Sequence, residues 1–184
     1  MEQNTKKIIL IVIATLAGIL LVAGAVWLWI YYVPYDTYEN SQFKFQVKYP
    51  REWQKAEGYA GSVVTFVRPK QTALDVVQPN FNISVQEVPA HIATLKSFSE
   101  TITKQMIAIF DKNMQIVEDK DFTFGNRQGH RLIIDAPQPQ NMKAIFVWTI
   151  KGSLAYIFTY MSKIDQYKEL APTVNQMVSS FEFK

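Results

Sequence analysis

The clearest structural signal in the chain is a hairpin: residues 144–160 read AIFVWTIKGSLAYIFTY. Two runs rich in β-branched and aromatic residues, 144–150 and 154–160, flank Lys151, Gly152 and Ser153. β-branched and aromatic residues favour strands, and a three-residue connection with a glycine favours a tight turn between antiparallel strands. The stretch therefore predicts an antiparallel sheet as the basis of the fold.

Further strands are expected on the N-terminal side of this hairpin. The first candidate, residues 43–49, alternates apolar side chains with Lys or Gln and stops at Pro50, which is the period-2 pattern of a half-buried strand. A turn at 125–129, with a glycine at each end, predicts a second hairpin. We expect strands at residues 43–49, 62–67, 81–88, 116–124 and 131–134, with a polar loop at 68–80.

Two helices complete the pattern. Ser97 and Glu100 have the spacing of a capping box, and apolar residues follow at helical spacing: Phe98, Ile102, Met106, Ile109 and Phe110. The last 20 residues carry a second helical pattern that should begin near Ala171 or break there, because Pro172 is acceptable only in a first turn or at a kink. Hairpin-linked strands with two helices predict an α+β fold, an antiparallel β-sheet sandwiched by helices.

An apolar segment precedes this domain. Residues 8–33 contain no charged residue, and as a helix they would be about 39 Å long, more than the roughly 30 Å of a hydrocarbon core. Lys6 and Lys7 precede the segment, and Trp and Tyr residues cluster at its end. The positive-inside rule then predicts a signal anchor. We expect residues 1–7 in the cytoplasm, a transmembrane helix at 8–33, a linker at 34–42 and an extracytoplasmic domain at 43–184.

A cleaved signal peptide is the alternative for this segment. Ala23, Gly24 and Ala25 have the small-x-small form of a cleavage site. Cleavage after Ala25 would leave an apolar stretch, 26–33, too short for the roughly 20 residues that a membrane span needs. The anchor is favoured because the apolar run continues past the point where a mature protein normally turns polar.

Composition excludes several classes of function. The chain has no cysteine, so disulfides, thiol catalysis and thiolate metal sites are impossible. Its formal net charge is only +3 and its basic residues are scattered among acidic ones. A nucleic-acid-binding protein would show a basic stripe or cluster, so we expect no nucleic acid partner.

No motif in the sequence carries chemistry. His91 and His130 have none of the spacings of a zinc or catalytic site. Glu118, Asp119 and Asp121 resemble half a site for a hard cation, but Lys120 lies among them and strand alternation sends neighbours to opposite faces. A solvated hairpin is the better interpretation. We therefore assign no catalytic, cofactor-binding or metal-binding residue and expect no enzyme.

The segments above resemble the PsbP-like family. Residues 38–45 (YENSQFKF) and 49–53 (YPREW) resemble the family's opening strand and the Pro and Trp corner after it. Later segments follow in the family's order: 64–66, 81–85, a Gly129-His130 turn, 151–156 and 177–181. The resemblance covers residues 38–184 and implies an antiparallel sheet between helices. It supplies no catalytic residue. The photosystem II role of the plant member is not expected here, because we see neither a transit peptide nor a lipoprotein Cys.

The leading hypothesis is a non-enzymatic extracytoplasmic binding or assembly module, tethered to the membrane through residues 8–33 and acting through protein contacts. One alternative is an accessory domain that binds calcium, zinc or manganese. The other is a hydrolase whose site is assembled from residues distant in sequence.

Overall fold

The computed structural model describes residues 15–16, 18–24, 35–73, 77–110, 113–124, 127–137 and 141–184. The chain divides into two compact units, Met1–Pro34 and Tyr35–Lys184. In the first unit, residues 15–16 and 18–24 are helical. Among the described residues we find no helix with the length and apolarity that crossing a membrane requires. Most of the span expected at 8–33, and all of residues 1–7, lie outside the described residues.

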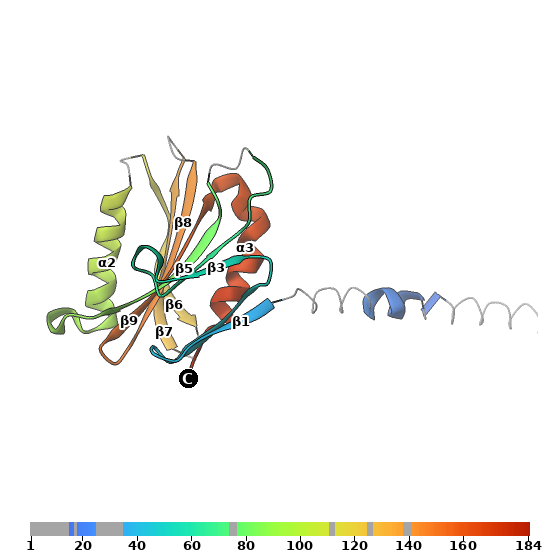
Figure 1. Ribbon diagram of the computed structural model, residues 1–184. Helices are drawn as coiled ribbons and strands as arrows, with labels where there is room; N and C mark the ends of the chain where they lie inside the picture. The colour runs from blue at the N-terminus through green and yellow to red at the C-terminus, as the bar shows by residue number, and fades with distance from the viewer. Residues whose placement is uncertain are drawn as a thin grey trace, which may run out of the picture. The chain divides into compact units, whose positions relative to one another are not determined.

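The second unit contains two antiparallel sheets in the part of the chain that the structure describes (Figure 1). The large sheet has seven strands in the order β3 (Gln54–Glu57), β4 (Val64–Val67), β5 (Asn80–Glu87), β9 (Leu154–Lys163), β8 (Met142–Lys151), β7 (Arg127–Ala136) and β6 (Gln115–Phe124). The small sheet has three, β1 (Tyr35–Asn40), β2 (Phe45–Pro50) and β10 (Glu182–Phe183). The helices are α2 (Leu95–Ile109), α3 (Ile164–Ser179) and the short 3-10 helices η1 (Tyr59–Gly61) and η2 (Ala90–Ile92).

Helices α2 and α3 lie on opposite faces of the large sheet (Figure 1). Along β8, Phe146 and Trp148 pack in one core with Phe98 of α2, whereas Val147, one residue along, packs in the other core with Val174 of α3. Both faces of this strand are therefore buried. That is why the run at 144–150 is apolar at every position except the buried Thr149 instead of alternating. The predicted α+β fold, a sheet with helices on its faces, is confirmed.

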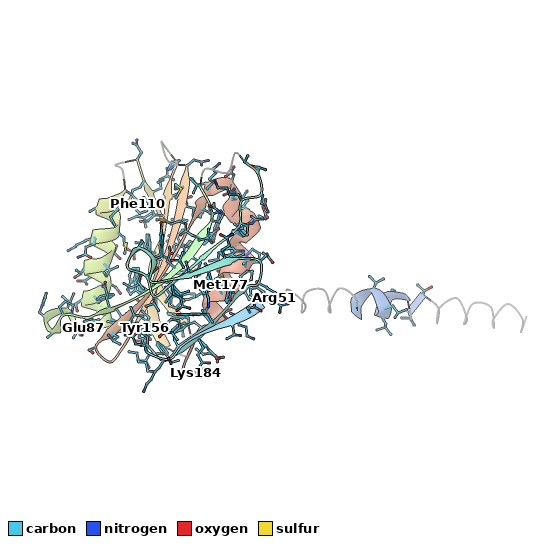
Figure 2. The ribbon with its side chains drawn as sticks, in the orientation of Figure 1. Arg51, Glu87, Phe110, Tyr156, Met177 and Lys184 are labelled. Carbon is cyan, nitrogen blue, oxygen red and sulfur yellow. The ribbon has the colours of Figure 1, made fainter. Side chains whose placement is uncertain are left out.

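The small sheet and α3 cover the same face of the large sheet. Phe45 and Val47 of β2 are fully buried there, and Phe45 lies 5.4 Å from Phe181, centroid to centroid. Tyr156 of β9 and Met177 of α3 lie in the same core (Figure 2). The last strand, β10, pairs with β2 and forms one edge of the small sheet. A strand of two residues carries no periodicity, so the sequence did not predict it.

The prediction of a linker at 34–42 is wrong for most of these residues, because residues 35–40 form β1 and pair with β2. The domain therefore begins at Tyr35 and not at residue 43. Within β1 only Tyr38 is buried, with its ring 6.0 Å from that of Phe45. One buried side chain in a polar hexapeptide gives no period-2 pattern, which is why this strand looked like a linker.

Both helices start earlier than predicted. Thr94 caps α2, since its Oγ1 accepts a hydrogen bond from the backbone N–H of Ser97 at 3.1 Å. Helix α3 begins at Ile164 and continues through Pro172. A proline inside a helix removes the hydrogen bond to the carbonyl four residues earlier. Here that carbonyl belongs to Lys168, and both residues are exposed, so water can take the place of the missing N–H.

The turns of both predicted hairpins are shorter than expected. Gly152 and Ser153 alone connect β8 to β9, and Gly152 has a φ of 63°. In the other hairpin β7 already begins at Arg127, so Gly129 is a strand residue and not part of a turn. An ideal Cβ at Gly129 would lie 2.5 Å from the backbone oxygen of Trp148. Gly129 is required there by the close approach of β7 and β8.

Candidate functional site

The hairpin of β6 and β7 forms one edge of the large sheet, and a cleft opens on each of its faces. The α2–β6 cleft has a volume of about 670 Å³ and lies between α2 and this hairpin. The α3–β7 cleft has a volume of about 580 Å³ and lies on the side of α3. Both volumes fall within the roughly 300–1,000 Å³ typical of ligand pockets.

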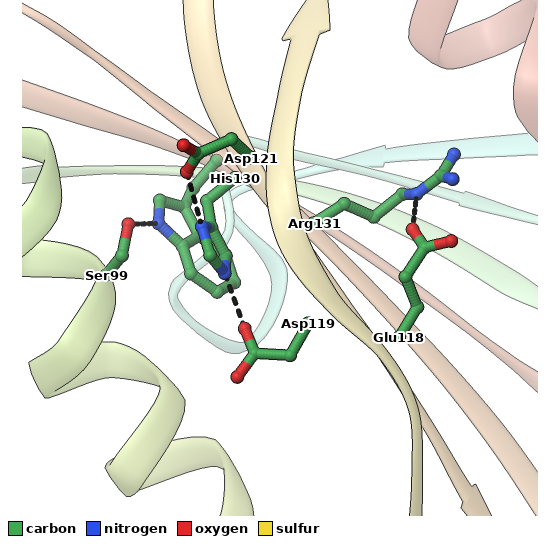
Figure 3. Close-up of polar contacts among 7 residues, drawn as sticks. Ser99, Glu118, Asp119, Asp121, His130 and Arg131 are labelled. Carbon is green, nitrogen blue, oxygen red and sulfur yellow. Dashed lines mark hydrogen bonds and ion pairs between the residues drawn. The ribbon is translucent and has the colours of Figure 1, made fainter.

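His130 is the central polar residue of the α2–β6 cleft (Figure 3). Its Nε2 lies 2.5 Å from Oδ1 of Asp119, and its Nδ1 lies 3.3 Å from Oδ1 of Asp121. The imidazole ring stacks on Trp148, with centroids 4.9 Å apart. Trp148 in turn donates from Nε1 to Oγ of Ser99 on α2 at 2.8 Å. The histidine is therefore held by the strand on one side and by the helix, through Trp148, on the other.

The two aspartates face opposite nitrogens of the imidazole ring, Asp119 at Nε2 and Asp121 at Nδ1. A carboxylate accepts hydrogen bonds, so a ring nitrogen that carries a proton can donate to the aspartate that faces it.

The same contacts occupy both ring nitrogens of His130. A nucleophile would need to lie within hydrogen-bond reach of one ring nitrogen, but in the described part of the chain each nitrogen faces a carboxylate. The hydroxyl of Ser99 on α2 accepts a hydrogen bond from Trp148. Among the described residues we find no group of three or more His, Asp or Glu side chains placed to hold a metal ion.

The two walls of the α2–β6 cleft differ in charge. Helix α2 contributes Lys96, Glu100 and Lys104, which recur every four residues along one face of the helix. Strand β6 contributes Asp119 and Asp121. The side chain of Asp121 is 99% exposed, so its oxygens remain open to hydrogen bonding from outside.

A second polar group lies on the opposite face of the same hairpin. Arg131 donates from Nε to Oε1 of Glu118 (Figure 3), and Nζ of Lys120 lies 3.0 Å from Oε2 of Glu118. The guanidinium carbon lies 4.6 Å from the centre of the Phe122 ring. The hydrogen bond from Arg131 lowers the pKa of Glu118, with a smaller contribution from Lys120.

The acidic residues of β6 therefore separate as strand alternation predicts, with Glu118 on one face and Asp119 and Asp121 on the other. The structure adds His130, which the sequence left without a partner. Asp121 stands directly opposite His130 in the hairpin register, and a turn of two residues would have placed it there. The other histidine, His91, lies exposed in η2.

The fold defines the class: an α+β domain in which helices cover both faces of an antiparallel sheet. The family model described as PsbP matches residues 34–183 of the chain. The chain belongs to the PsbP family, as its opening and closing segments predicted. A comparison with curated proteins found no match.

Several solved structures share the fold. The cyanobacterial PsbP protein (CyanoP) of Synechocystis is 13% identical, with a TM-score of 0.61 over 83% of this chain and 94% of that one. The Ran-binding protein Mog1p of Saccharomyces cerevisiae is 8% identical, with a TM-score of 0.56 over 82% and 96%. LpqN of Mycobacterium tuberculosis, involved in cell envelope biogenesis, is 7% identical, with a TM-score of 0.56 over 83% and 92%. At these identities the likeness is one of fold.

Proposed function

We propose that this protein is a non-enzymatic binding or assembly module that acts through protein contacts at the α2–β6 cleft. The observation that carries the proposal is the fixed trio of Asp119, His130 and Asp121 at the surface of that cleft. The side chains of Asp119 and Asp121 are 39% and 99% exposed, whereas both nitrogens of the histidine already face a carboxylate. Such a group is arranged for recognition and not for proton transfer to a substrate.

The two walls of the cleft suit a partner that carries both charges. Asp119 and Asp121 would accept hydrogen bonds from basic side chains of the partner, and Lys96 and Lys104 would pair with acidic ones. The stack of His130 on Trp148 holds the trio in place before binding, which lowers the entropy lost on association. Mog1p, which has this fold, is a Ran-binding protein, so the fold is compatible with a role in protein contacts.

We further propose that residues 8–33 tether the domain on the outer face of a cytoplasmic membrane. In support, the described helical part of this segment has apolar side chains that are 55–75% exposed: Leu16, Ile19, Leu20, Leu21 and Val22. Large apolar side chains exposed together in this way mark a surface that another apolar phase covers. Lys6 and Lys7 on its N-terminal side favour a cytoplasmic N-terminus.

The partner proposal is tested by affinity capture from native membranes. The wild-type chain should recover a specific protein that the Asp119→Asn and Asp121→Asn variants fail to recover, because each change removes a charged acceptor from the cleft. Asp36→Asn is the matched control, since Asp36 is a partly exposed carboxylate on β1, outside the cleft. Equal recovery by all four proteins would place the contact elsewhere and refute the proposal.

The tether is tested separately on the mature protein. We expect an N-terminus at Met1 or Glu2, retention in membranes after alkaline carbonate washing, and loss of the domain when protease is added outside intact cells. A mature protein that starts at Val26 would have lost the span, and the anchor would be refuted.

A further inference from the structure

The α3–β7 cleft, on the other face of the hairpin, has an apolar lining. Strands β6 to β8 contribute Phe124, Ile133, Ile145 and Val147, and α3 contributes Val174 and Val178. All six belong to the core on this face of the sheet. The cleft exists because α3 packs mainly on β2, β8 and β9, so the helix does not extend over the outer strands β6 and β7.

Arg131 places a cation at the edge of this apolar cleft. Its Nε donates a hydrogen bond to Glu118 (Figure 3). Within the described part of the chain, no group accepts a hydrogen bond from the two terminal nitrogens of Arg131. The arginine side chain is 23% exposed, so an anion that binds it would be partly shielded from water.

The local charge balance also favours an anion. Glu118 is paired with both Arg131 and Lys120, so these three groups carry a net charge of +1. Tyr167 of α3 lines the same cleft. Burial raises the pKa of its hydroxyl, and the positive charge of Arg131 opposes this effect. The phenol therefore stays protonated at neutral pH and is available as a further donor.

We propose that the α3–β7 cleft binds a small organic carboxylate, with its apolar part against the cleft lining and its carboxylate on the terminal nitrogens of Arg131. A guanidinium presents paired N–H groups in the geometry that a carboxylate accepts. The roughly 580 Å³ of the cleft suits a ligand of one or two rings or a short acyl chain. Phe122 and Thr123 line both clefts, but Arg131 lines only this one, whereas Asp119 and Asp121 line only the other. The charged group of this site is therefore distinct from the group proposed to bind a protein partner in the α2–β6 cleft.

The ligand is unidentified, so the test uses a matched pair of probes, 2-naphthoate and its neutral amide, 2-naphthamide. Both are titrated against the full chain in phosphatidylcholine nanodiscs, followed by naphthalene fluorescence, with empty nanodiscs as the blank. We expect 2-naphthoate to bind at least about tenfold more tightly than 2-naphthamide, since charge-assisted hydrogen bonds contribute that much.

Two variants assign the site and one serves as a control. Arg131→Gln should weaken binding of 2-naphthoate at least about tenfold and leave binding of 2-naphthamide unchanged. Val178→Phe should weaken both probes, because the larger ring fills the cleft without touching the charge. Arg51→Gln, which removes an arginine that is paired with Asp36 and lies outside the cleft, should change neither.

Equal affinity for the two probes, or no binding of 2-naphthoate at millimolar concentration, would overturn the proposal. So would unchanged binding in both Arg131→Gln and Val178→Phe. If Arg131→Gln fails to fold, which its melting curve will reveal, the Val178→Phe variant and the pair of probes still test whether this cleft binds the carboxylate.

Discussion

Replacing Gly129 by Ala tests the packing that positions the candidate site. An ideal Cβ at this position would lie 2.5 Å from the backbone oxygen of Trp148, although real Cβ contacts are essentially never shorter than 3.0 Å. It would also lie 3.1 Å from Cε1 of Phe124 and 3.3 Å from the backbone oxygen of Phe122. Strands β7 and β8 would therefore have to move apart by at least about 0.5 Å.

The expected cost follows from the kind of atom that is displaced. Overpacking of a core costs about 1–3 kcal/mol, and the upper part of this range applies because the nearest atom belongs to the backbone of a paired strand. The lower conformational entropy of an unfolded chain with Ala instead of Gly offsets about 0.4–1 kcal/mol. We expect Gly129→Ala to lower the free energy of unfolding by about 2 kcal/mol and the melting temperature by about 4–8 °C.

Gly152→Ala provides the comparison, because nothing lies within 4 Å of its ideal Cβ and its cost comes only from a φ of +63°. We expect a loss of about 1 kcal/mol there. The assay is thermal and urea unfolding of both variants, with amide hydrogen exchange across the pair formed by Gly129 and Thr149. A Gly129→Ala variant that is as stable as wild type, or more stable than Gly152→Ala, would refute the close approach of the two strands.

Three further predictions concern stability. Trp53 is only 4% exposed, so Trp53→Ala should cost about 3–5 kcal/mol, and an unchanged melting temperature would remove this residue from the core. The pKa of Glu118 lies below its ordinary value of 4.5, so its contribution to stability is present above that pH and declines as the pH falls through the lowered value. Glu118→Gln should therefore be less stable than wild type at pH 7, with the difference shrinking below about pH 4.5 in urea midpoints. A fragment of residues 35–184 should unfold cooperatively, whereas residues 43–184, which lack β1 and its buried Tyr38, should melt at a lower temperature; identical melting curves would contradict the role of β1.

The sequence was sufficient to predict those parts of the fold whose residue pattern lies within a single segment of the chain. The hairpin at 144–160 was predictable from its own residues, because two β-branched and aromatic runs on either side of a glycine turn favour paired antiparallel strands over other structures. The division of Glu118 from Asp119 and Asp121 was predictable for a similar reason, since strand alternation is local geometry. Family membership followed from an ordered set of such segments.

The sequence did not predict features that depend on contacts between segments distant in the chain. Strand β1 looked like a linker because its single buried residue, Tyr38, is defined by β2 and β4 side chains packed against it. The predicted start of α3 was wrong because Pro172 was taken to end or begin the helix, which considers only the residues next to it. The buried face of the helix, with Leu170 and Val174, is decided by the sheet that the helix covers.

For this protein, then, local covalent geometry and side-chain periodicity determined the class of fold, the helices α2 and α3 and the strands of its main hairpins. Tertiary structure alone decided which polar residues meet. His130 faces Asp119 and Asp121 because the strand register puts it opposite Asp121, and it stacks on Trp148 because Gly129 lets β8 approach closely beside it. A change of one residue in register would send the histidine to the other face of the sheet, so its contacts depend on the pairing of strands and not on the composition of any one of them.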